Sequence, residues 1–299
     1  MNKSGKRINA EAYRLGFIGI GLMGKPLTLR LLAAGYQMGV WNRTVDKLTE
    51  VCAAGAIAYA DIGALVRDSD IILLCLADGA VVQEVTEKYL LHSGSANKLV
   101  IDLSSIHPET TQLLAEQLNE SCGMRWVDAP VSGGVAGAEQ GTLAIMAGGA
   151  DTDIAIAREV LKPLYRQLTH MGPLGSGQIT KICNQMIVSC NVLVLAEMMA
   201  LAQQSGVDAA KIPVALAGGF ADSKPLQITG VDMANHDFTS VKWRVKTLLK
   251  DLEMALALSS ADNTCTPMSA LAAQLLRLHG TKGYLEQDPS TLIKLYQSE

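Results

Sequence analysis

Short apolar runs alternate with helix-patterned segments over the first half of the chain. The most continuous apolar runs are 15–20 (LGFIGI), 71–76 (IILLCL) and 99–103 (LVIDL). Each is too short for an ordinary helix, whereas parallel strands buried on both faces are apolar throughout. Further strands are predicted at 37–41, 56–58, 125–128 and 144–147, and helices at 25–34 and 46–54. Strands that alternate with helices predict βαβ units around a parallel sheet.

The alternation stops near the segment GPLGSG, residues 172–177. Residues 179–204 then form one long apolar, periodic run rich in Ala and Met, which predicts the central helix of a second domain. Further helices are predicted at 208–217, 241–261 and 267–278. We therefore predict an α/β domain with a doubly wound parallel sheet over residues 1–175, followed by an all-α domain over residues 176–299.

Composition narrows the range of partners. The 299 residues are 49% hydrophobic and 18% charged, as in ordinary globular proteins. A net charge of −4 and an aromatic content of 4% argue against nucleic acid and anionic membrane surfaces as partners. The polar N-terminus MNKSGKRINAEAYR has no apolar core, and no stretch approaches ~18 consecutive apolar residues. We expect neither a signal peptide nor a membrane span, and a cytoplasmic location.

The cysteines and histidines indicate neither disulfides nor a metal. None of the six cysteines forms a Cys-x-x-Cys pair, so reduced and mostly buried thiols are expected. The five histidines are scattered and lack the spacing of metal ligands, so no metal site is expected.

A Gly-x-Gly-x-x-Gly motif follows the first predicted strand and opens the first predicted helix. In this context Gly19 allows a tight turn, Gly21 lets the backbone approach a pyrophosphate, and Gly24 lets helix and strand pack closely. The phosphates of a dinucleotide then meet free N–H groups at the helix N-terminus. A plain glycine-rich turn is the alternative. The context favours a Rossmann-type, NAD(P)-binding domain.

The end of the second predicted strand reads Trp-Asn-Arg-Thr, where an NAD-binding domain usually has an acidic residue. An acid there binds both ribose hydroxyls and repels a 2′-phosphate. Asn42 removes that repulsion, and Arg43 and Thr44 supply a guanidinium and a hydroxyl that a 2′-phosphate can accept hydrogen bonds from. The alternative is that Arg43 is a solvated loop residue. The pattern predicts NADP as the cofactor, with NAD less favoured.

Five further segments, together with the glycine loop, carry a resemblance to a known family. They are DLSS (102–105), DAPVSGG (128–134), GTLAIMAGG (141–149), GSGQITKICNQ (175–185) and KDLEMAL (250–256). In this order the chain resembles the β-hydroxyacid dehydrogenases, which include 3-hydroxyisobutyrate dehydrogenases, tartronate semialdehyde reductases and glyoxylate/succinic semialdehyde reductases. The resemblance covers nearly the whole chain.

The resemblance assigns the substrate-binding and catalytic residues. It implies that Ser132, Gly133 and Gly134 of DAPVSGG bind the substrate carboxylate, and small residues with free N–H groups suit an anion. It also matches Lys181 to the family's catalytic lysine. Asn184 and Gln185 follow at i+3 and i+4, on the same helical face. Judged from Lys181 alone, without the surrounding motif, the alternative interpretation is an exposed lysine at the start of a helix.

The resemblance also implies cofactor contacts beyond the three glycines. They are expected from Ile20, Leu22 and Met23 in the glycine loop, from Leu76 and Ala77, from Ser104 and Ser105, and from Lys250. Ser105 matches a residue on the nicotinamide side of the cofactor. Relatives usually have Leu-Pro at the Leu76-Ala77 pair, so this chain departs from the family pattern at Ala77.

These parts imply an oxidoreductase that transfers a hydride between NADP(H) and a small β-hydroxy acid or the matching semialdehyde. Lys181 would exchange a proton with the substrate oxygen. Because the run 179–204 is apolar nearly all round, and because relatives are oligomeric, a homodimer or homotetramer is expected.

Two alternatives remain from the sequence. Imine reductases share the fold and the NADP loop but usually replace the catalytic lysine, which this chain retains. A non-catalytic cofactor-binding regulator would not need Lys181 with Asn184. The larger relative 6-phosphogluconate dehydrogenase has a longer helical domain than residues 176–299 allow.

Overall fold

The computed structural model describes residues 13–297 of the chain. Much of the polar N-terminus on which the signal-peptide prediction rests therefore lies outside the described residues. The chain divides into two compact units, Met1–Lys181 and Ile182–Glu299. The division falls inside helix α9 (Ser176–Gln204), a few residues beyond the expected boundary at residue 175.

The first unit is built on one mixed sheet with the order β3-β2-β1-β4-β5-β6-β8-β7, and β9 pairs with β8. The strands are β1 Leu15–Ile18, β2 Met38–Trp41, β3 Ile57–Ala58, β4 Ile71–Leu74, β5 Leu99–Asp102, β6 Arg125–Asp128, β7 Val131–Ser132, β8 Leu143–Gly148 and β9 Tyr165–Gly172. Strands β1 to β6 are parallel. The strand order reverses between β1 and β4, as in a doubly wound fold, which confirms the predicted fold class.

Two features of this sheet differ from the expected pattern. Strand β8, predicted at 144–147, runs antiparallel to β6 and β7 instead of continuing the parallel series. Strand β9 was not predicted, because five of its eight positions are not apolar and most of its side chains are partly or fully exposed. A strand at the solvated end of a sheet lacks the continuous apolar signal of a central strand.

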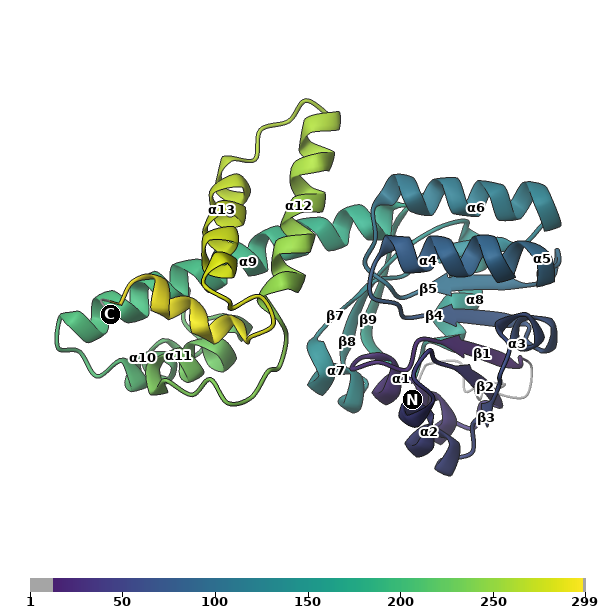
Figure 1. The fold of residues 1–299 in the computed structure, drawn as a ribbon, viewed down its shortest axis with the longest axis horizontal. Helices are drawn as coiled ribbons and strands as arrows, with labels where there is room; N and C mark the ends of the chain where they lie inside the picture. Colours follow the sequence, from purple (N-terminus) through teal and green to yellow (C-terminus); the bar gives the residue numbers. More distant parts are fainter. Residues whose placement is uncertain (1–12, 298–299) are drawn as a thin grey trace. The chain divides into compact units, whose positions relative to one another are not determined.

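Helices cover both faces of the sheet (Figure 1). They are α1 Gly24–Ala33, η2 Val45–Leu48, α2 Thr49–Ala53, α3 Ile62–Asp68, α4 Gly79–Val85, η3 Thr86–Leu90, α5 Leu91–Ser93, α6 Pro108–Cys122, α7 Gly134–Gln140 and α8 Asp151–Val160. Neighbouring strand residues point to opposite faces, so Phe17 and Leu73 enter a core with α1 and α8, while Ile18 and Leu74 enter a core with α3, α4 and α6. Each central strand is thus buried on both sides.

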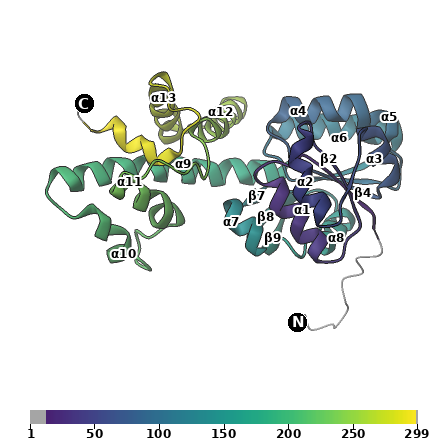
Figure 2. The ribbon, with the colours of Figure 1, turned by 60° about the horizontal axis from the view of Figure 1, so that its bottom comes forward.

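The second unit is helical and is organised around α9. In Figures 1 and 2, α12 (Val245–Ala261) and α13 (Pro267–Thr281) lie on one side of α9, and α10 (Ile212–Leu216) and α11 (Val231–Asn235) on the other. The remaining elements are η4 Ala209–Lys211, η5 Leu226–Gly230 and η6 Pro289–Leu295. By length and composition α9 could cross a membrane, but half of its most apolar window is buried inside the protein. We therefore interpret it as a core helix.

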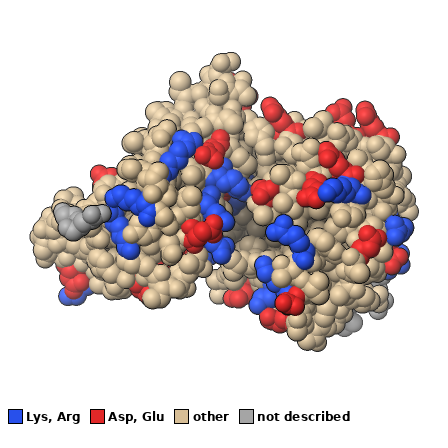
Figure 3. Space-filling model, viewed as in Figure 1, with Lys and Arg blue, Asp and Glu red and all other residues tan. Residues whose placement is uncertain are grey.

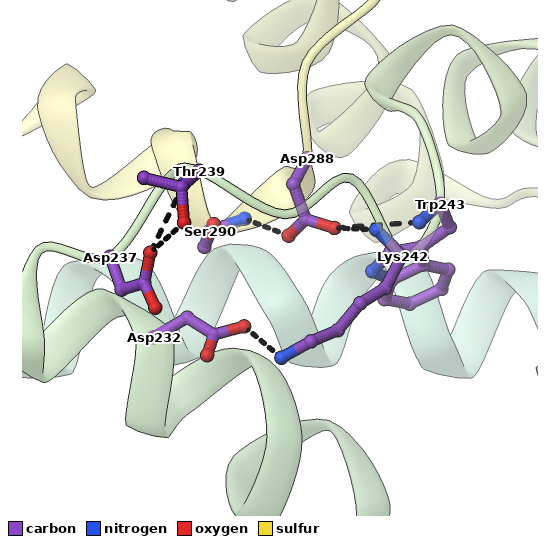
Figure 4. Close-up of polar contacts among 7 residues, drawn as sticks. All are labelled: Asp232, Asp237, Thr239, Lys242, Trp243, Asp288 and Ser290. Carbon is purple, nitrogen blue, oxygen red and sulfur yellow. Dashed lines mark hydrogen bonds and ion pairs between the residues drawn. The ribbon is translucent and has the colours of Figure 1, made fainter. Parts of the chain in front are cut away.

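The start of α12 differs from the prediction for a reason visible in Figure 4. The helix was expected from residue 241 but begins at Val245, after an extended segment. The buried Asp288 carboxylate accepts hydrogen bonds from the backbone N–H of Lys242 (2.9 Å) and of Ser290 (3.0 Å), which ties that segment to η6. The Lys242 ammonium also pairs with Asp232 at 2.5 Å. The Lys242 N–H is thus satisfied without a helix at this position.

Two further expectations need correction. The sequence predicts no helix between residues 217 and 241, but η5 begins at Leu226 and leads directly into α11. The cysteines were expected to be mostly buried, yet Cys183 on α9 and Cys265 between α12 and α13 are exposed and the other four are half-buried; none of the six is in a disulfide. The apolar run that contains Cys183 has one solvent-facing side, which its composition alone does not reveal.

On the face shown in Figure 3, basic and acidic side chains are interspersed among larger uncharged areas. This distribution agrees with the small net charge of −4. Among the described residues, no group of three or more His, Cys, Asp or Glu side chains could hold a metal ion.

Candidate active site

The glycine loop lies between β1 and α1, at the carboxyl end of the central strand. Gly19 has a φ of +105°, and a Cβ there would overlap the carbonyl of Cys75. A Cβ on Gly24 would overlap the carbonyl oxygen of Gly19. A Cβ on Gly21, in contrast, would meet nothing within 4 Å. Packing inside the chain therefore requires Gly19 and Gly24 but not Gly21, which fits a position where a pyrophosphate approaches the backbone.

This contrast gives a paired prediction. Gly24→Ala should lower the melting temperature by several degrees, because overpacking costs about 1–3 kcal/mol. Gly21→Ala should leave the melting temperature of the free protein unchanged and weaken NADPH binding at least tenfold, about 1.4 kcal/mol. Differential scanning fluorimetry and fluorescence titration with NADPH measure the two effects. Unchanged NADPH affinity in Gly21→Ala would show that the cofactor does not approach this residue.

The other residues of the loop differ in exposure. Ile20 is buried in the core, Met23 is half-buried, and Leu22 is 55% exposed. Of these, the buried side chain of Ile20 is available for packing only, so a cofactor contact from Ile20 would come from its backbone.

Asn42 is joined to the glycine loop by its side chain. Its Oδ1 accepts a hydrogen bond from the Ile20 N–H at 2.9 Å, and its Nδ2 donates to the Thr44 carbonyl at 2.8 Å. The amide therefore holds the loop against the end of β2. The expected contact of Asn42 with the ribose stays a prediction, and each polar atom of its amide already makes one hydrogen bond within the chain. An acidic residue could keep the Oδ1 contact but not the donation to Thr44.

Arg43 and Thr44 are exposed at the end of β2, where the 2′-phosphate was expected. The pKa of Glu84 on α4 is lowered, first by its hydrogen bond from Lys88 and further by the positive charge of Arg43. The guanidinium is thus at the surface near the carboxyl ends of β1 and β2.

The segments after β4 and β5 are linked by one serine. The Ser104 hydroxyl accepts a hydrogen bond from the Leu76 N–H at 2.9 Å, and the Ser104 N–H donates to Asp102 Oδ1 at 2.9 Å. Ser104 is 2% exposed, whereas Ser105 is half-buried and Ala77 exposed. Ser104 therefore shapes the strand ends. Because the Leu76 N–H is used, a backbone contact from Leu76 to the cofactor would use its carbonyl.

Two buried carboxylates at this edge were not singled out in the sequence. Asp102 and Asp128 end the neighbouring strands β5 and β6 and are paired in register. Burial raises the pKa of Asp102 to about 7; hydrogen bonds from Ser104 oppose the shift, and the charge of Asp128 adds to it. Burial also raises the pKa of Asp128, against backbone N–H donors at Gly175 and Gln178. An acidic residue closing an apolar strand, as in LVID and RWVD, is the signal that identifies both.

The expected substrate loop follows β6. Ser132 ends β7 and is half-buried, and Gly133 and Gly134, with φ values of +137° and +63°, lead into α7. L-amino acids with side chains rarely adopt these angles, so glycine is needed here for the backbone path. A Cβ on Gly134 would meet nothing within 4 Å, so packing places no demand on that position.

Lys181 lies in the second turn of α9, whose start is fixed against the sheet. Asp128 accepts hydrogen bonds from the N–H of Gly175 and of Gln178, both at 2.8 Å. A Cβ on Gly177 would overlap the carbonyl oxygen of Met146, so the helix packs closely on β8. Lys181 is half-buried there. The hydrogen bonds to Asp128 and the close packing of Gly177 hold the helical turn that precedes it in place.

Asn184 and Gln185, expected on the same face as Lys181, are engaged with each other. Asn184 Nδ2 donates to Gln185 Oε1 at 2.8 Å, and Gln185 Nε2 donates to Asp251 Oδ2 on α12 at 2.5 Å. Gln185 is 7% exposed, while Asn184 is half-buried. Lys250, the expected cofactor contact in the helical unit, lies 3.4 Å from Asp251 Oδ1. Asp251 thus orders both Gln185 and Lys250 within that unit.

In the first unit, the structure brings most of the predicted residues to one edge of the sheet. The glycine loop, Asn42 to Thr44, Leu76–Ala77 and Ser104–Ser105 follow the carboxyl ends of β1, β2, β4 and β5. Ligands of doubly wound sheets bind outside this edge, where the strand order reverses. The arrangement suits a dinucleotide, and Lys181 lies on α9 in the same unit.

Comparisons with known proteins agree with this arrangement. The family model for the NAD binding domain of 6-phosphogluconate dehydrogenase matches residues 14–172. The family model for the NAD-binding segment of NADP-dependent 3-hydroxyisobutyrate dehydrogenase matches residues 175–296. The two matches follow the division between the sheet-containing and helical parts and support a nicotinamide cofactor.

Relatives match over nearly their full length. The chain is 34% identical over 284 residues to 2-hydroxy-3-oxopropionate reductase of Escherichia coli (strain K12), covering 94% of this chain and 96% of the relative. It is 30% identical over 295 residues to the mitochondrial 3-hydroxyisobutyrate dehydrogenase of Drosophila melanogaster, covering 96% and 90%. The solved structure of Mycobacterium tuberculosis 3-hydroxyisobutyrate dehydrogenase with L-serine has a TM-score of 0.85 at 27% identity, covering 96% and 99%.

Imine reductases are more distant. The structure of an imine reductase from Pseudomonas sp. has a TM-score of 0.63 at 20% identity, a likeness that shows the fold alone. The family models and the relatives above instead span both units in one order. The chain therefore belongs to the β-hydroxyacid dehydrogenases, a family of NAD(P)-dependent oxidoreductases.

Proposed function

We propose that the protein prefers NADP(H) and interconverts a small β-hydroxy acid and the matching semialdehyde, with Lys181 as the proton donor and acceptor. The observation that carries the proposal is the position of Lys181 on the fixed first turns of α9, in the unit that also contains the glycine loop and Ser132. The same unit thus supplies groups for the cofactor, for a carboxylate and for a proton.

The residues suit a dinucleotide in three respects. Gly21 has no neighbour that a Cβ would meet, so a phosphate can approach its backbone. Asn42 holds the loop in place through the Ile20 N–H, and exposed Arg43 can donate charge-assisted hydrogen bonds to a 2′-phosphate. When bound, the nicotinamide supplies the hydride chemistry.

The chain's own groups would bind, orient and protonate. The Ser132 hydroxyl and the backbone N–H groups of Gly133 and Gly134 would bind the substrate carboxylate. The Lys181 ammonium would donate a proton to the carbonyl oxygen during reduction and accept it from the hydroxyl during oxidation. While charged, it also stabilises the negative charge that develops on that oxygen. Asn184 would orient the substrate, with Gln185 holding the Asn184 amide.

The substrate class follows from the carboxylate-binding loop and from the relatives. The names of the two relatives point to 2-hydroxy-3-oxopropionate and 3-hydroxyisobutyrate. In both compounds one carbon atom separates the carboxylate from the reacting carbon. The Ser223 hydroxyl donates a hydrogen bond to Asn191 and accepts one from the Leu226 N–H. Lys224 is exposed. We therefore expect an acid of three or four carbons.

A panel of small β-hydroxy acids and semialdehydes, each assayed with NADP(H) and NAD(H), tests the proposal. We expect turnover with at least one member that has the carboxylate, and none with its amide or methyl ester, because the proposed loop recognises an anion. Turnover of cyclic imines in preference to every acid would contradict the proposal.

We also propose that the protein acts in the cytoplasm.

We further propose a homodimer or homotetramer, formed through the helical unit. Ile187, Val194 and Leu201 recur every seven residues on α9 and are 73%, 56% and 65% exposed. Residues at this spacing share one face of a helix, and an exposed apolar stripe of this kind indicates an interface. A second copy of the chain can cover it with the same stripe.

The oligomer gives a prediction that needs no substrate. Light scattering at micromolar concentration should give at least twice the monomer mass of 31.7 kDa, and Val194→Glu should reduce it by placing a charge on the apolar stripe. Leu113→Glu is the matched control, since Leu113 is 51% exposed on α6 in the first unit. A monomer mass for the unaltered protein would overturn the proposal.

A further inference from the structure

Gln178 is a polar side chain in the first turn of α9 that is fully buried. Its Nε2 donates to the Ser104 carbonyl at 2.9 Å, and its Oε1 accepts a hydrogen bond from the Ile106 N–H at 3.2 Å. Both ends of the amide are therefore bonded to the segment that follows β5. Burying an amide is costly unless it is hydrogen-bonded, and here both partners are backbone groups.

The same residue is joined to β6 through its own backbone. The Gln178 N–H donates to Asp128 Oδ2, and Asp128 Oδ1 accepts from the Gly175 N–H. Gln178 thus connects three pieces of the first unit: the start of α9, the end of β6, and residues 104–106. All these contacts lie within that unit.

The two segments joined by Gln178 carry two residues of the proposed site. Lys181 lies one helical turn after Gln178, so a shift or rotation of the first turn moves the Lys181 side chain as well. Ser105 lies between Ser104 and Ile106, the two residues whose backbone groups Gln178 bonds. One side chain thus determines how the loop that carries Ser105 and the helix that carries Lys181 are placed relative to each other.

We propose that Gln178 is a positioning residue for the hydride-transfer reaction. It fixes the separation between the segment around Ser105, proposed to contact the nicotinamide side of the cofactor, and the Lys181 amine, proposed to exchange the proton. The inference rests on the proposed function. Misplacing reacting groups by about 1 Å can cost on the order of 100-fold in rate, so a residue that touches neither cofactor nor substrate can control turnover.

Two variants separate positioning from packing. Gln178→Met has a side chain of similar length and keeps the hydrogen bond from its backbone N–H to Asp128, but it loses both side-chain hydrogen bonds. We expect kcat to fall at least tenfold, which is less than the effect of a full misplacement of the reacting groups. The KM for the cofactor should change less than threefold. Gln178→Glu keeps an acceptor for the Ile106 N–H and regains a donor toward the Ser104 carbonyl only when its carboxyl is protonated. Its kcat relative to the parent should therefore rise as the pH is lowered from 8 to 6.

The matched control is Ser69→Ala. Ser69 is also buried, and its hydroxyl donates to the Leu65 carbonyl at 2.7 Å in the same unit. Its removal deletes a buried side-chain-to-backbone hydrogen bond that has no link to residues 104–106 or to α9. We expect a lowered melting temperature and an unchanged kcat.

Hydrogen exchange tests the inference independently of turnover. In Gln178→Met, the amides of residues 104–106 and of 178–182 should both exchange faster than in the parent, whereas Ser69→Ala should leave them unchanged. Absence of any turnover by the parent would reject the proposed function but not the link between the segments. Parent-like kcat in Gln178→Met, or unchanged exchange at residues 104–106, would overturn the positioning role.

Discussion

Replacing Lys181 by alanine is expected to lower turnover at least ~100-fold while NADPH binding stays nearly unchanged. General acid–base catalysis contributes typically ~10²–10⁴-fold, and the variant has no group at this position that can exchange a proton. The glycine loop, Asn42 and Arg43 lie on other elements of the first unit, so the cofactor keeps these contacts. Steady-state rates and fluorescence titration with NADPH measure the two quantities.

Two further substitutions sharpen this test. Lys181→Arg keeps the positive charge but holds its proton far more tightly, so it should remain impaired if proton exchange, and not charge alone, is required. Lys211→Ala is the control, since the Lys211 side chain is 82% exposed in the helical unit. A rate above about a tenth of the parent in Lys181→Ala would contradict the acid–base role.

Cofactor choice should favour NADP(H) over NAD(H) at least tenfold in kcat/KM. A 2′-phosphate carries close to two negative charges, and no acidic side chain stands at position 42 to repel it. Tenfold corresponds to ~1.4 kcal/mol, less than the ~1.5–3 kcal/mol typical of one hydrogen bond to a charged group. Arg43→Leu alone should therefore remove most of the preference, and Arg166→Leu, at an exposed position of β9, should not.

The double variant Asn42→Asp with Arg43→Leu should reverse the preference, because it adds repulsion and removes the attraction. The structure adds a cost to this variant. An aspartate keeps the acceptor for the Ile20 N–H but loses the donation to the Thr44 carbonyl, so some loss of rate with both cofactors is expected. Equal use of NADP(H) and NAD(H) by the unaltered protein would show that Arg43 does not contact the phosphate.

The sequence predicted the central strands and helices α9, α12 and α13 well, but it missed α6. Strands β1, β4 and β5 are buried on both faces, so they are apolar except for Asp102 at the end of β5 and stand out from their surroundings. Strand β9 has a single buried residue, Leu168, and a mixed composition. The elements η5 and α11 are short, and η5 contains Thr229 and Gly230, which have low helix propensity. Such segments depend on tertiary contacts.

The site was predictable where its signal is local. The glycine loop and the motif around Lys181 are recognisable because their spacing is fixed within one turn and one helix. The functions of Asn42, Asp128 and Gln178 are not visible in the same way, since their partners lie 22, 50 and 74 residues away in the chain. Only the fold brings such partners together. The hydrogen bonds that result show structural roles for these residues that the motifs alone do not indicate.

The double burial of the central strands has a consequence for how their alignment is chosen during folding. When one face of a sheet is exposed to solvent, a slip of the strand register by one residue exposes the apolar side chains and is therefore unfavourable. Here Phe17 and Ile18 enter two different apolar cores, so a slip would exchange their surroundings without exposing either. The hydrophobic pattern therefore discriminates poorly between alignments.

The discrimination must come from contacts that exist in one alignment only, and several of these lie at the carboxyl ends of the strands. Ser104 bonds the Leu76 N–H, Asn42 bonds the Ile20 N–H, and Gly19 packs directly on the Cys75 carbonyl. The residues that form the nucleotide edge of the sheet are thus also those that distinguish the native strand alignment from its neighbours. A substitution at Ser104, Asn42 or Gly19 is therefore expected to disturb the strand alignment as well as this edge of the sheet.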